Sequence, residues 1–189
     1  MTDLKQIFFK TGIVLAIIAS TIFVSCQNDI DKVNQFTLPS NVPTFSVFGF
    51  ETVYSDSGRV MIDLKAREMS RYEGQNMKYD EYRYGLNVKF FDGYGKVTAT
   101  LRCLYARFLI EKELWEIKSN VEVDNISRNE KINTELMYWD MKAERVYSDK
   151  YVRITTEDEI LTGEGFESKQ DFSEWKILNP SGIISIKDE

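Results

Sequence analysis

From about residue 45 to the end of the chain, apolar and polar residues alternate with a period of two. This period is typical of β-strands that bury one face and expose the other to water. In residues 59–67, for example, Val60, Ile62, Leu64 and Ala66 share one face and charged residues occupy the other. Turn clusters such as Asp56-Ser57-Gly58 separate such segments. The pattern predicts an all-β domain of roughly ten or more strands, with two packed sheets or one rolled sheet around an apolar interior.

Two regions depart from this alternation. Residues 69–84 fit neither a strand nor a helix period, and we expect a long hairpin loop there. Residues 27–44 are polar and contain Pro39 and Pro43, which indicates a flexible tether. We therefore expect three parts, namely an N-terminal segment over residues 1–25, a tether over residues 26–44 and a β-domain over residues 45–189.

The N-terminal segment has the features of an export signal. Lys5 and Lys10 precede an uncharged apolar run, residues 11–24, and Ser25 and Cys26 follow it. The ending Phe-Val-Ser-Cys resembles the lipobox of bacterial lipoproteins, in which the cysteine receives the lipid. An uncleaved anchor helix that extends back through Ile7 is the alternative. With Cys26 acylated, Cys103 has no partner for an intrachain disulfide and is expected to be a small buried side chain.

The composition argues against several classes of function. The 189 residues contain no histidine, which removes the commonest general base and metal ligand, so we expect neither an enzyme nor a cofactor or bound metal. A formal charge of −6 makes nucleic acid an unsuitable partner, because phosphate binding needs a basic surface. The carboxylates of residues 157–159 fall in a predicted turn, where solvation is the simplest role, with a calcium site as the alternative.

Four short motifs resemble one family. They are Trp115 with Asn120-Val121, then Thr134-Glu135 with Met137 and Trp139, then Val152 with Ile154, and finally Leu161-x-Gly163-x-Gly165-Phe166. Together with a hairpin-like segment at residues 50–73, they resemble the LptC-like proteins, the periplasmic bridge component of the lipopolysaccharide export machine. The resemblance covers roughly residues 45–186.

The resemblance implies a twisted antiparallel β-jellyroll that is open at both ends and has no enzymatic activity. It implies that lipopolysaccharide arrives from an inner-membrane ATP-driven transporter and passes to the next jellyroll, with acyl chains inside an apolar trough and sugars outside. It also implies a location at the periplasmic face of the inner membrane, although a lipidated cysteine leaves the outer membrane open. The candidate lining residues are Val60, Ile62, Leu64, Val97, Ala99, Leu101, Cys103, Ile117, Val121, Ile132, Leu136, Tyr138, Val152, Ile154 and Phe166. For each of them, packing in the core without contact to cargo is the alternative role.

The end of the chain suggests a docking edge. Ile183, Ile184, Ser185 and Ile186 form an apolar strand with charges only after it, and an edge strand without blunting charges invites pairing with another sheet. We expect the next jellyroll of the bridge to pair there. The rival interpretation of the whole chain is a surface or periplasmic lipoprotein that binds glycans or proteins, which would share the signal, the tether and the sandwich.

The first prediction concerns the anchor. A cell fed a clickable fatty acid should label the wild-type chain, and Cys26→Ala should abolish the label because the acylated thiol is gone. The measurement is in-gel fluorescence after immunoprecipitation. Equal labelling of the two proteins would contradict lipidation at Cys26.

Overall fold

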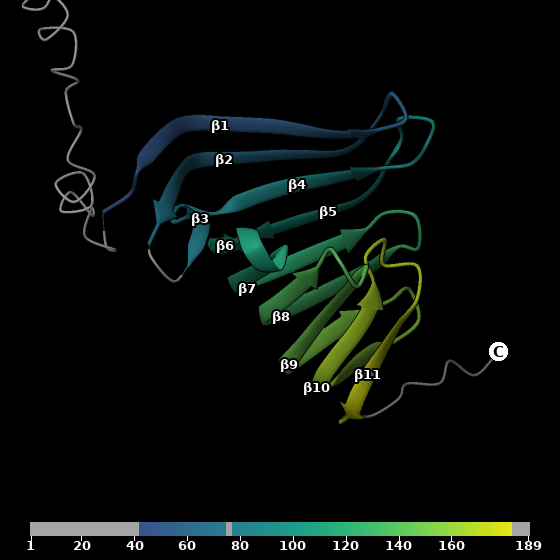
Figure 1. Ribbon diagram of the computed structural model, residues 1–189. Coiled ribbons are helices and arrows are strands. Elements are labelled where there is room, and N and C mark those ends of the chain that lie inside the picture. Colours follow the sequence, from purple (N-terminus) through teal and green to yellow (C-terminus); the bar gives the residue numbers. More distant parts are fainter. Residues whose placement is uncertain (1–41, 75–76, 183–189) are drawn as a thin grey trace, which may run out of the picture. The chain divides into compact units, whose positions relative to one another are not determined.

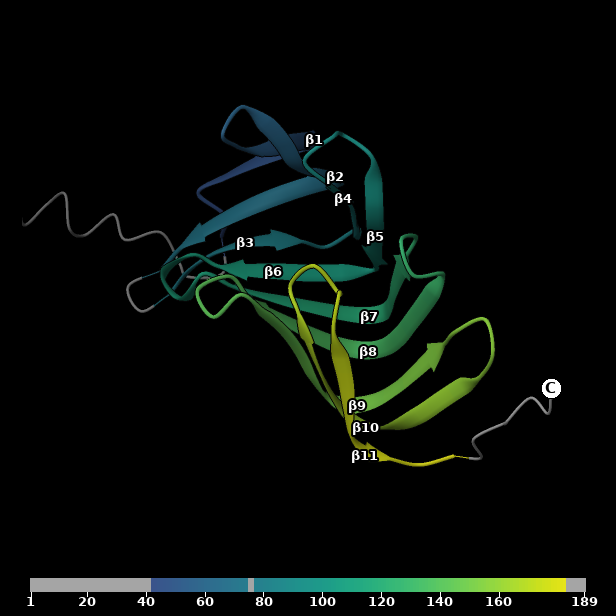
Figure 2. The ribbon, with the colours of Figure 1, turned by 90° about the vertical axis from the view of Figure 1, so that its right-hand side faces the viewer.

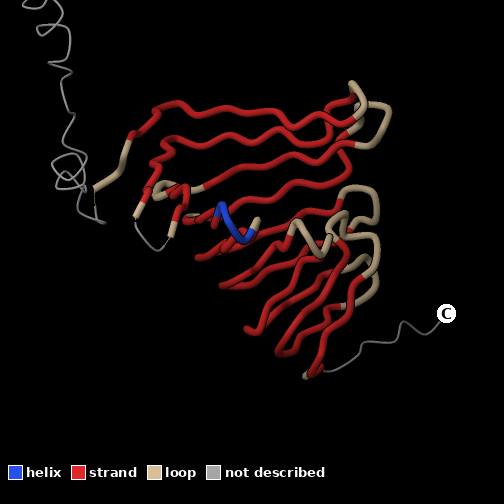
Figure 3. The backbone as a smooth tube through the Cα atoms, viewed as in Figure 1, coloured by secondary structure: helices blue, strands red, loops and turns tan. Residues whose placement is uncertain are grey.

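The structure, a computed structural model, describes residues 42–74 and 77–182. In these residues the chain forms one antiparallel sheet of eleven strands and a single turn of 3₁₀ helix, η1 (Ile110–Lys112) (Figures 1 and 3). The predicted all-β jellyroll is confirmed. The strands are β1 (Phe45–Asp56), β2 (Arg59–Glu73), β3 (Lys78–Tyr82), β4 (Leu86–Phe91), β5 (Val97–Cys103), β6 (Tyr105–Leu109), β7 (Leu114–Asn125), β8 (Glu130–Asp140), β9 (Arg145–Thr155), β10 (Ile160–Lys169) and β11 (Trp175–Pro180).

Two long strands, β2 and β7, belong to two layers at once. β2 pairs with β4 through residues 62–66 and with β3 through residues 70–73. β7 pairs with β6 through residues 114–118 and with β5 through residues 122–125. Since β3 pairs with β6 and β4 with β5, the six strands close a ring around an interior. We name the two sides the β4–β5 layer and the β3–β6 layer.

Strands β8, β9 and β10 continue both layers, because each of them bends at the same level as β7 (Figure 2). The pairing register shifts between Lys118 and Val121 in β7, between Thr134 and Tyr138 in β8, and between Glu164 and Phe166 in β10. A register shift of this kind inserts an extra residue into one strand and bends it. We name this line of aligned shifts the crease.

Backbone conformation at the crease explains which residues stand there. Ser119 and Asn120 have φ angles of 65° and 53°, and Gly165 has a φ of 79°. Glycine and asparagine tolerate this left-handed region better than other residues do. Short or flexible residues therefore stand at the positions where the hydrogen-bond ladder between the strands is interrupted.

Buried hydroxyl groups replace ladder hydrogen bonds that the crease removes. Ser148 donates to the carbonyl of Leu136 at 2.6 Å, and Thr134 donates to the carbonyl of Tyr151 at 2.8 Å. The backbone N–H of Lys150 donates to the Ser148 hydroxyl at 3.1 Å. A buried backbone group without a partner costs about 1–3 kcal/mol, so these two side chains make the bend tolerable.

The crease also corrects one expectation. Alternation from Ile132 predicts Leu136 and Tyr138 inside, but the extra residue reverses the phase, and the buried residues are Met137 (0% exposed) and Trp139 (6% exposed). Tyr138 instead stacks on Tyr147, with ring centroids 5.1 Å apart, on the opposite face of the sheet. Leu136 and Tyr138 are therefore wrong as interior residues.

Two further expectations need correction. Val60 is 40% exposed, because the register shifts at the start of β2 and places it beyond the interior. Residues 69–84 are not a long loop, since β2 runs to Glu73 and β3 begins at Lys78. Strand β2 crosses between the layers here, so Met69 and Ser70 are both buried and the simple period of two is lost.

The close approach of β11 to β10 depends on Gly163. A Cβ atom at this position would lie 2.4 Å from the Asn179 carbonyl oxygen and 2.5 Å from Cγ2 of Ile177. Both distances are shorter than real contacts, and the carbonyl belongs to the backbone, so β11 would have to move away.

The second prediction follows from this contact. Gly163→Ala should lower the free energy of unfolding by about 1–3 kcal/mol, the range for overpacked sites, and lower the melting temperature in circular dichroism. Gly93→Ala is the control, because there the nearest atom, at 3.0 Å, is Nη1 at the flexible end of Arg59. Equal shifts for the two variants would show that Gly163 does not set the β10–β11 distance.

Candidate lipid trough

The interior between the two layers is lined by most of the residues that alternation predicted. None of the following is more than 7% exposed: Leu64, Ala99, Leu101, Cys103, Ile117, Val121, Ile132, Val152, Ile154 and Phe166. Ile62 is partly buried and packs against the same cluster, and Val97 is half-buried. The structure thus brings strands β2, β5, β7, β8, β9 and β10 together around one apolar interior.

Alternation does not identify several interior residues. It places Met137 and Trp139 on the outer face, although both belong to the Thr134-Glu135 motif. Tyr82 (3% exposed) lies in the stretch interpreted as a loop, and its ring packs 5.4 Å from that of Trp115. Phe172 (1% exposed) comes from the polar turn between β10 and β11, where no periodicity identifies it. Only the motif around Trp139 carried a signal that could have corrected the phase.

Two cavities lie at the margins of this interior. One, of about 440 Å³, is lined by Leu161, Trp175, Ile177 and neighbours at the β10–β11 end of the sheet. The other, of about 380 Å³, is lined by Met61, Ile62, Phe90, Phe91, Trp139 and Met141 together with several polar residues. The first has mostly apolar walls, and the second combines an apolar wall with the carboxylates of Asp56, Glu144 and Asp171. Side chains fill the space between the layers.

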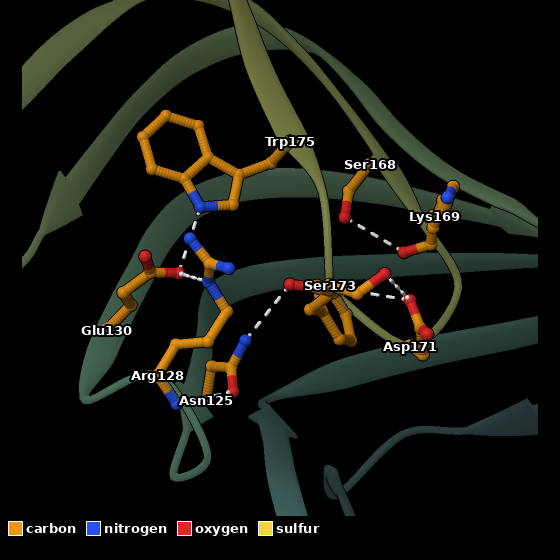
Figure 4. A network of polar contacts seen from close by, with 9 residues as sticks. Asn125, Arg128, Glu130, Ser168, Lys169, Asp171, Ser173 and Trp175 are labelled. Atoms are coloured by element: carbon orange, nitrogen blue, oxygen red, sulfur yellow. Dashed lines mark hydrogen bonds and ion pairs between the residues drawn. The ribbon is translucent and has the colours of Figure 1, made fainter.

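A polar network closes the layers against each other (Figure 4). The amide Nδ2 of Asn125, at the end of β7, donates to the backbone carbonyl of Phe172 at 3.0 Å. The indole Nε1 of Trp175 donates to Oε2 of Glu130 at 2.9 Å, and Arg128 donates to the same oxygen at 3.0 Å. Residues 170–174, which we name the closing loop, are thereby held on the β7–β8 turn.

Charged groups stay at the surface or are paired there. Arg102 pairs with Glu122 on the outer face, and Lys176 pairs with Glu167 at 2.8 Å. Asp80 is the carboxylate of a bidentate pair with Arg71, at 2.6 and 2.7 Å. Pairing is what makes the burial of Asp80 tolerable. Glu130, in phase with Ile132 on β8, is likewise buried and pairs with Arg128 at 3.0 Å, so the buried carboxylates border the apolar cluster as neutralised pairs.

The titratable groups nearest the interior are poor reagents for chemistry. Burial raises the pKa of the Cys103 thiol to about 11, so the thiol stays protonated and unreactive near neutral pH. Burial alone would raise the pKa of Glu81, but hydrogen bonds from Tyr105 and Arg83 outweigh it and lower that pKa, which keeps the carboxylate ionised. No group of three or more potential metal ligands occurs within residues 42–74 and 77–182. The arrangement can hold apolar cargo through non-directional contacts.

Comparison with known families agrees with this geometry. A family model described as "Lipopolysaccharide-assembly, LptC-related" matches residues 12–180. The chain belongs to the LptC family. No curated protein matches the chain.

Membership of the LptC family gives the chain a role in lipopolysaccharide transport. Members of the family are periplasmic bridge components anchored to the inner membrane. They interact with lipopolysaccharide and with other Lpt proteins, and the family is not a known family of enzymes. Among the residues that the structure describes, no helix is long and apolar enough to cross a membrane. Cys26 and the predicted docking edge, Ile183, Ile184, Ser185 and Ile186, fall outside the described ranges and remain predictions.

The LptC-like motifs meet at the crease. Asn120 and Val121 form its β7 side, Thr134 holds β8 to β9, and Gly165 provides the bend in β10. The motif residues that drew attention in the sequence thus shape the two-layered interior.

Proposed function

We propose that the chain receives lipopolysaccharide from the jellyroll of an inner-membrane ATP-driven transporter and passes it to a periplasmic bridge protein. The acyl chains travel through the apolar interior and the sugars stay outside. The observation that carries the proposal is the uncharged apolar cluster that runs through both layers from β2 to β10. Each buried methylene of a lipid contributes about 0.8 kcal/mol, so several short contacts suffice to hold an acyl chain without a specific group.

The two ends of the sheet support a place in a chain of jellyrolls. In the described residues β1 pairs only with β2, and β11 pairs only with β10. Each therefore offers a free edge to another sheet, as in β-strand addition. The interior of one domain would then continue into the next.

Strand β1 has the properties of an edge that is normally covered. Its 12 residues are nearly all exposed on both faces, and Phe45, Val47, Phe48, Val53 and Tyr54 are large apolar side chains among them. Natural edge strands usually carry lysine, proline or bulges that prevent pairing. Strand β11 carries Lys176 and Pro180, so β1 is the more open edge of the two. We assign β1 to the transporter jellyroll and the β11 end to the bridge protein.

The third prediction tests whether cargo enters the interior. A photo-crosslinking amino acid at Trp139, which faces the interior, should trap lipopolysaccharide in cells. The matched control is the neighbouring aromatic Tyr138, which faces the other way and stacks on Tyr147. The measurement is an immunoblot for the lipopolysaccharide adduct. Equal adducts at the two positions, or none at Trp139, would refute transport through the interior.

The fourth prediction tests the β1 edge. Phe48 is 76% exposed, so Phe48→Lys should leave the melting temperature unchanged within a few degrees, while its charge blocks an apolar edge contact. We expect the full chain with this change to lose most of its co-purification with the inner-membrane transporter.

The control for this edge is Tyr94→Lys. Tyr94 is 97% exposed in the β4–β5 turn, away from either edge strand, and its replacement should leave co-purification intact. If Phe48→Lys still co-purifies at the wild-type level, β1 is not the docking edge.

A further inference from the structure

The closing loop joins two parts of the fold that the sheet itself does not join. It follows β10, whose last residues pair with the part of β9 that belongs to the β3–β6 layer. The Gln170 N–H donates to the carbonyl of Glu144 in the β8–β9 turn, and Asn125 at the β7–β8 turn, which belongs to the β4–β5 layer, donates to the carbonyl of Phe172. Trp175, directly after the loop, donates to Glu130 at the same β7–β8 turn. Asn125 and Glu130, which bond to Phe172 and Trp175, are paired with each other on either side of that turn. The loop therefore bridges the two layers on the side of the interior that lies away from the crease.

Phe172 at the centre of this loop occupies interior space. Its side chain is 1% exposed, and its ring packs edge-on against Phe90 with centroids 6.0 Å apart. Its φ angle is 57°, a conformation that is strained for a bulky side chain. A residue held in such a conformation is kept there by its surroundings, and such strain is common at clamps and switches.

The loop can leave as a unit, because it has its own internal hydrogen bonds. The N–H of Phe172 donates to the carbonyl of Lys169 at 3.0 Å, and the N–H of Lys169 donates to the carbonyl of Glu174 at 3.1 Å. Ser173 donates to Asp171 through both its N–H and its hydroxyl. Polar bonds hold the loop to the rest of the fold: Asn125 donates to the Phe172 carbonyl, Trp139 donates to Gln170, and the Gln170 N–H donates to the Glu144 carbonyl. Water can replace these bonds when the groups become exposed, whereas the buried Phe172 ring needs an apolar replacement.

The cavity of about 380 Å³ lies directly beside this loop. Gln170 and Asp171 form part of its wall, and its apolar lining comes from β2, β4 and the end of β8. Phe90 borders the cavity and also touches Phe172. Displacement of Phe172 would extend the cavity toward the filled interior. A volume of this size lies within the usual range of about 300–1,000 Å³ for ligand pockets.

We propose that this cavity is a lateral entry site for an acyl chain of the cargo, and that Phe172 is the side chain that the acyl chain displaces. The inference rests on the proposed function, since it needs lipid cargo in the interior. In this proposal the closing loop controls access to the interior, in addition to its contribution to packing. While no cargo is bound, Phe172 fills the space and keeps water out of an apolar interior.

The fifth prediction uses the full chain in phospholipid nanodiscs with purified lipopolysaccharide and a photo-crosslinking amino acid at Phe91, a half-buried residue of the cavity wall. In this protein Phe172→Ala should raise the initial rate of adduct formation at least threefold. Tyr72→Ala is the matched control, because Tyr72 is also a buried aromatic residue but lies outside the apolar cluster and does not line the cavity. Both changes remove a buried ring, and only the first opens the entry site.

A second variant keeps the test decisive if Phe172→Ala fails to fold. Trp175→Phe retains the ring but loses the N–H that donates to Glu130, so the loop should open more often and the rate should again rise. Equal rates for Phe172→Ala and Tyr72→Ala, or a Trp175→Phe rate no higher than wild type, would overturn the inference. If Trp139 traps lipopolysaccharide and Phe91 does not, the lateral entry fails and transport through the interior stands. If neither position traps it, both proposals fail.

Discussion

Four neighbouring strands have to bend at the same level if one sheet is to provide both walls of an apolar interior. In this chain β7, β8, β9 and β10 do so along the crease, where the register shifts are aligned. A bend in one strand alone would leave its neighbours with unpaired N–H and C=O groups, each costing about 1–3 kcal/mol. When the bends are aligned, neighbouring strands interrupt their ladders at the same level and keep their other pairs. The hydroxyls of Thr134 and Ser148 then bond to the carbonyls that the interruption leaves unpaired. The phase of the interior residues in β8 after Thr134 follows from this line.

The sequence predicts the strands because alternation reports burial directly, and segments such as β4 and β5 lie as expected. Alternation alone cannot predict the phase beyond Thr134, because Leu136, Met137, Tyr138 and Trp139 are all apolar or aromatic, so both faces look equally buried. The phase is set by the register with β7 and β9, which is a property of strand pairing. Phe172 is harder still, because it lies in a polar turn and its carbonyl binds Asn125, 47 residues earlier in the chain. A contact over that separation leaves no local pattern.

Most ion pairs lie on the outer surface of the sheet, and apolar side chains line the interior. Ion pairs such as Lys131 with Asp124 lie on the outside, where water screens them and their contribution to stability is small. The charges of the inward faces lie at the border of the apolar cluster, where Asp80 and Glu130 are paired with arginines, and the Cys103 thiol is held protonated. Such a surface gives lipid no fixed position, because apolar contacts are non-directional. Weak repeated contacts of this kind suit cargo that has to leave again, which is what membership of the LptC family demands.

A transport interior faces a conflict between staying folded when empty and admitting cargo when loaded. An apolar space left open would fill with water or collapse, and interiors are normally as densely packed as organic crystals. Here side chains fill the space, and one of the fillers, Phe172, stands on a short loop with a strained backbone. Most of the packed side chains therefore belong to the sheet and stay in place, while the Phe172 ring, on the closing loop, is the part that can be displaced. Exchange of an aromatic ring for an acyl chain keeps the buried apolar area nearly constant, so loading and unloading need not unfold the two layers.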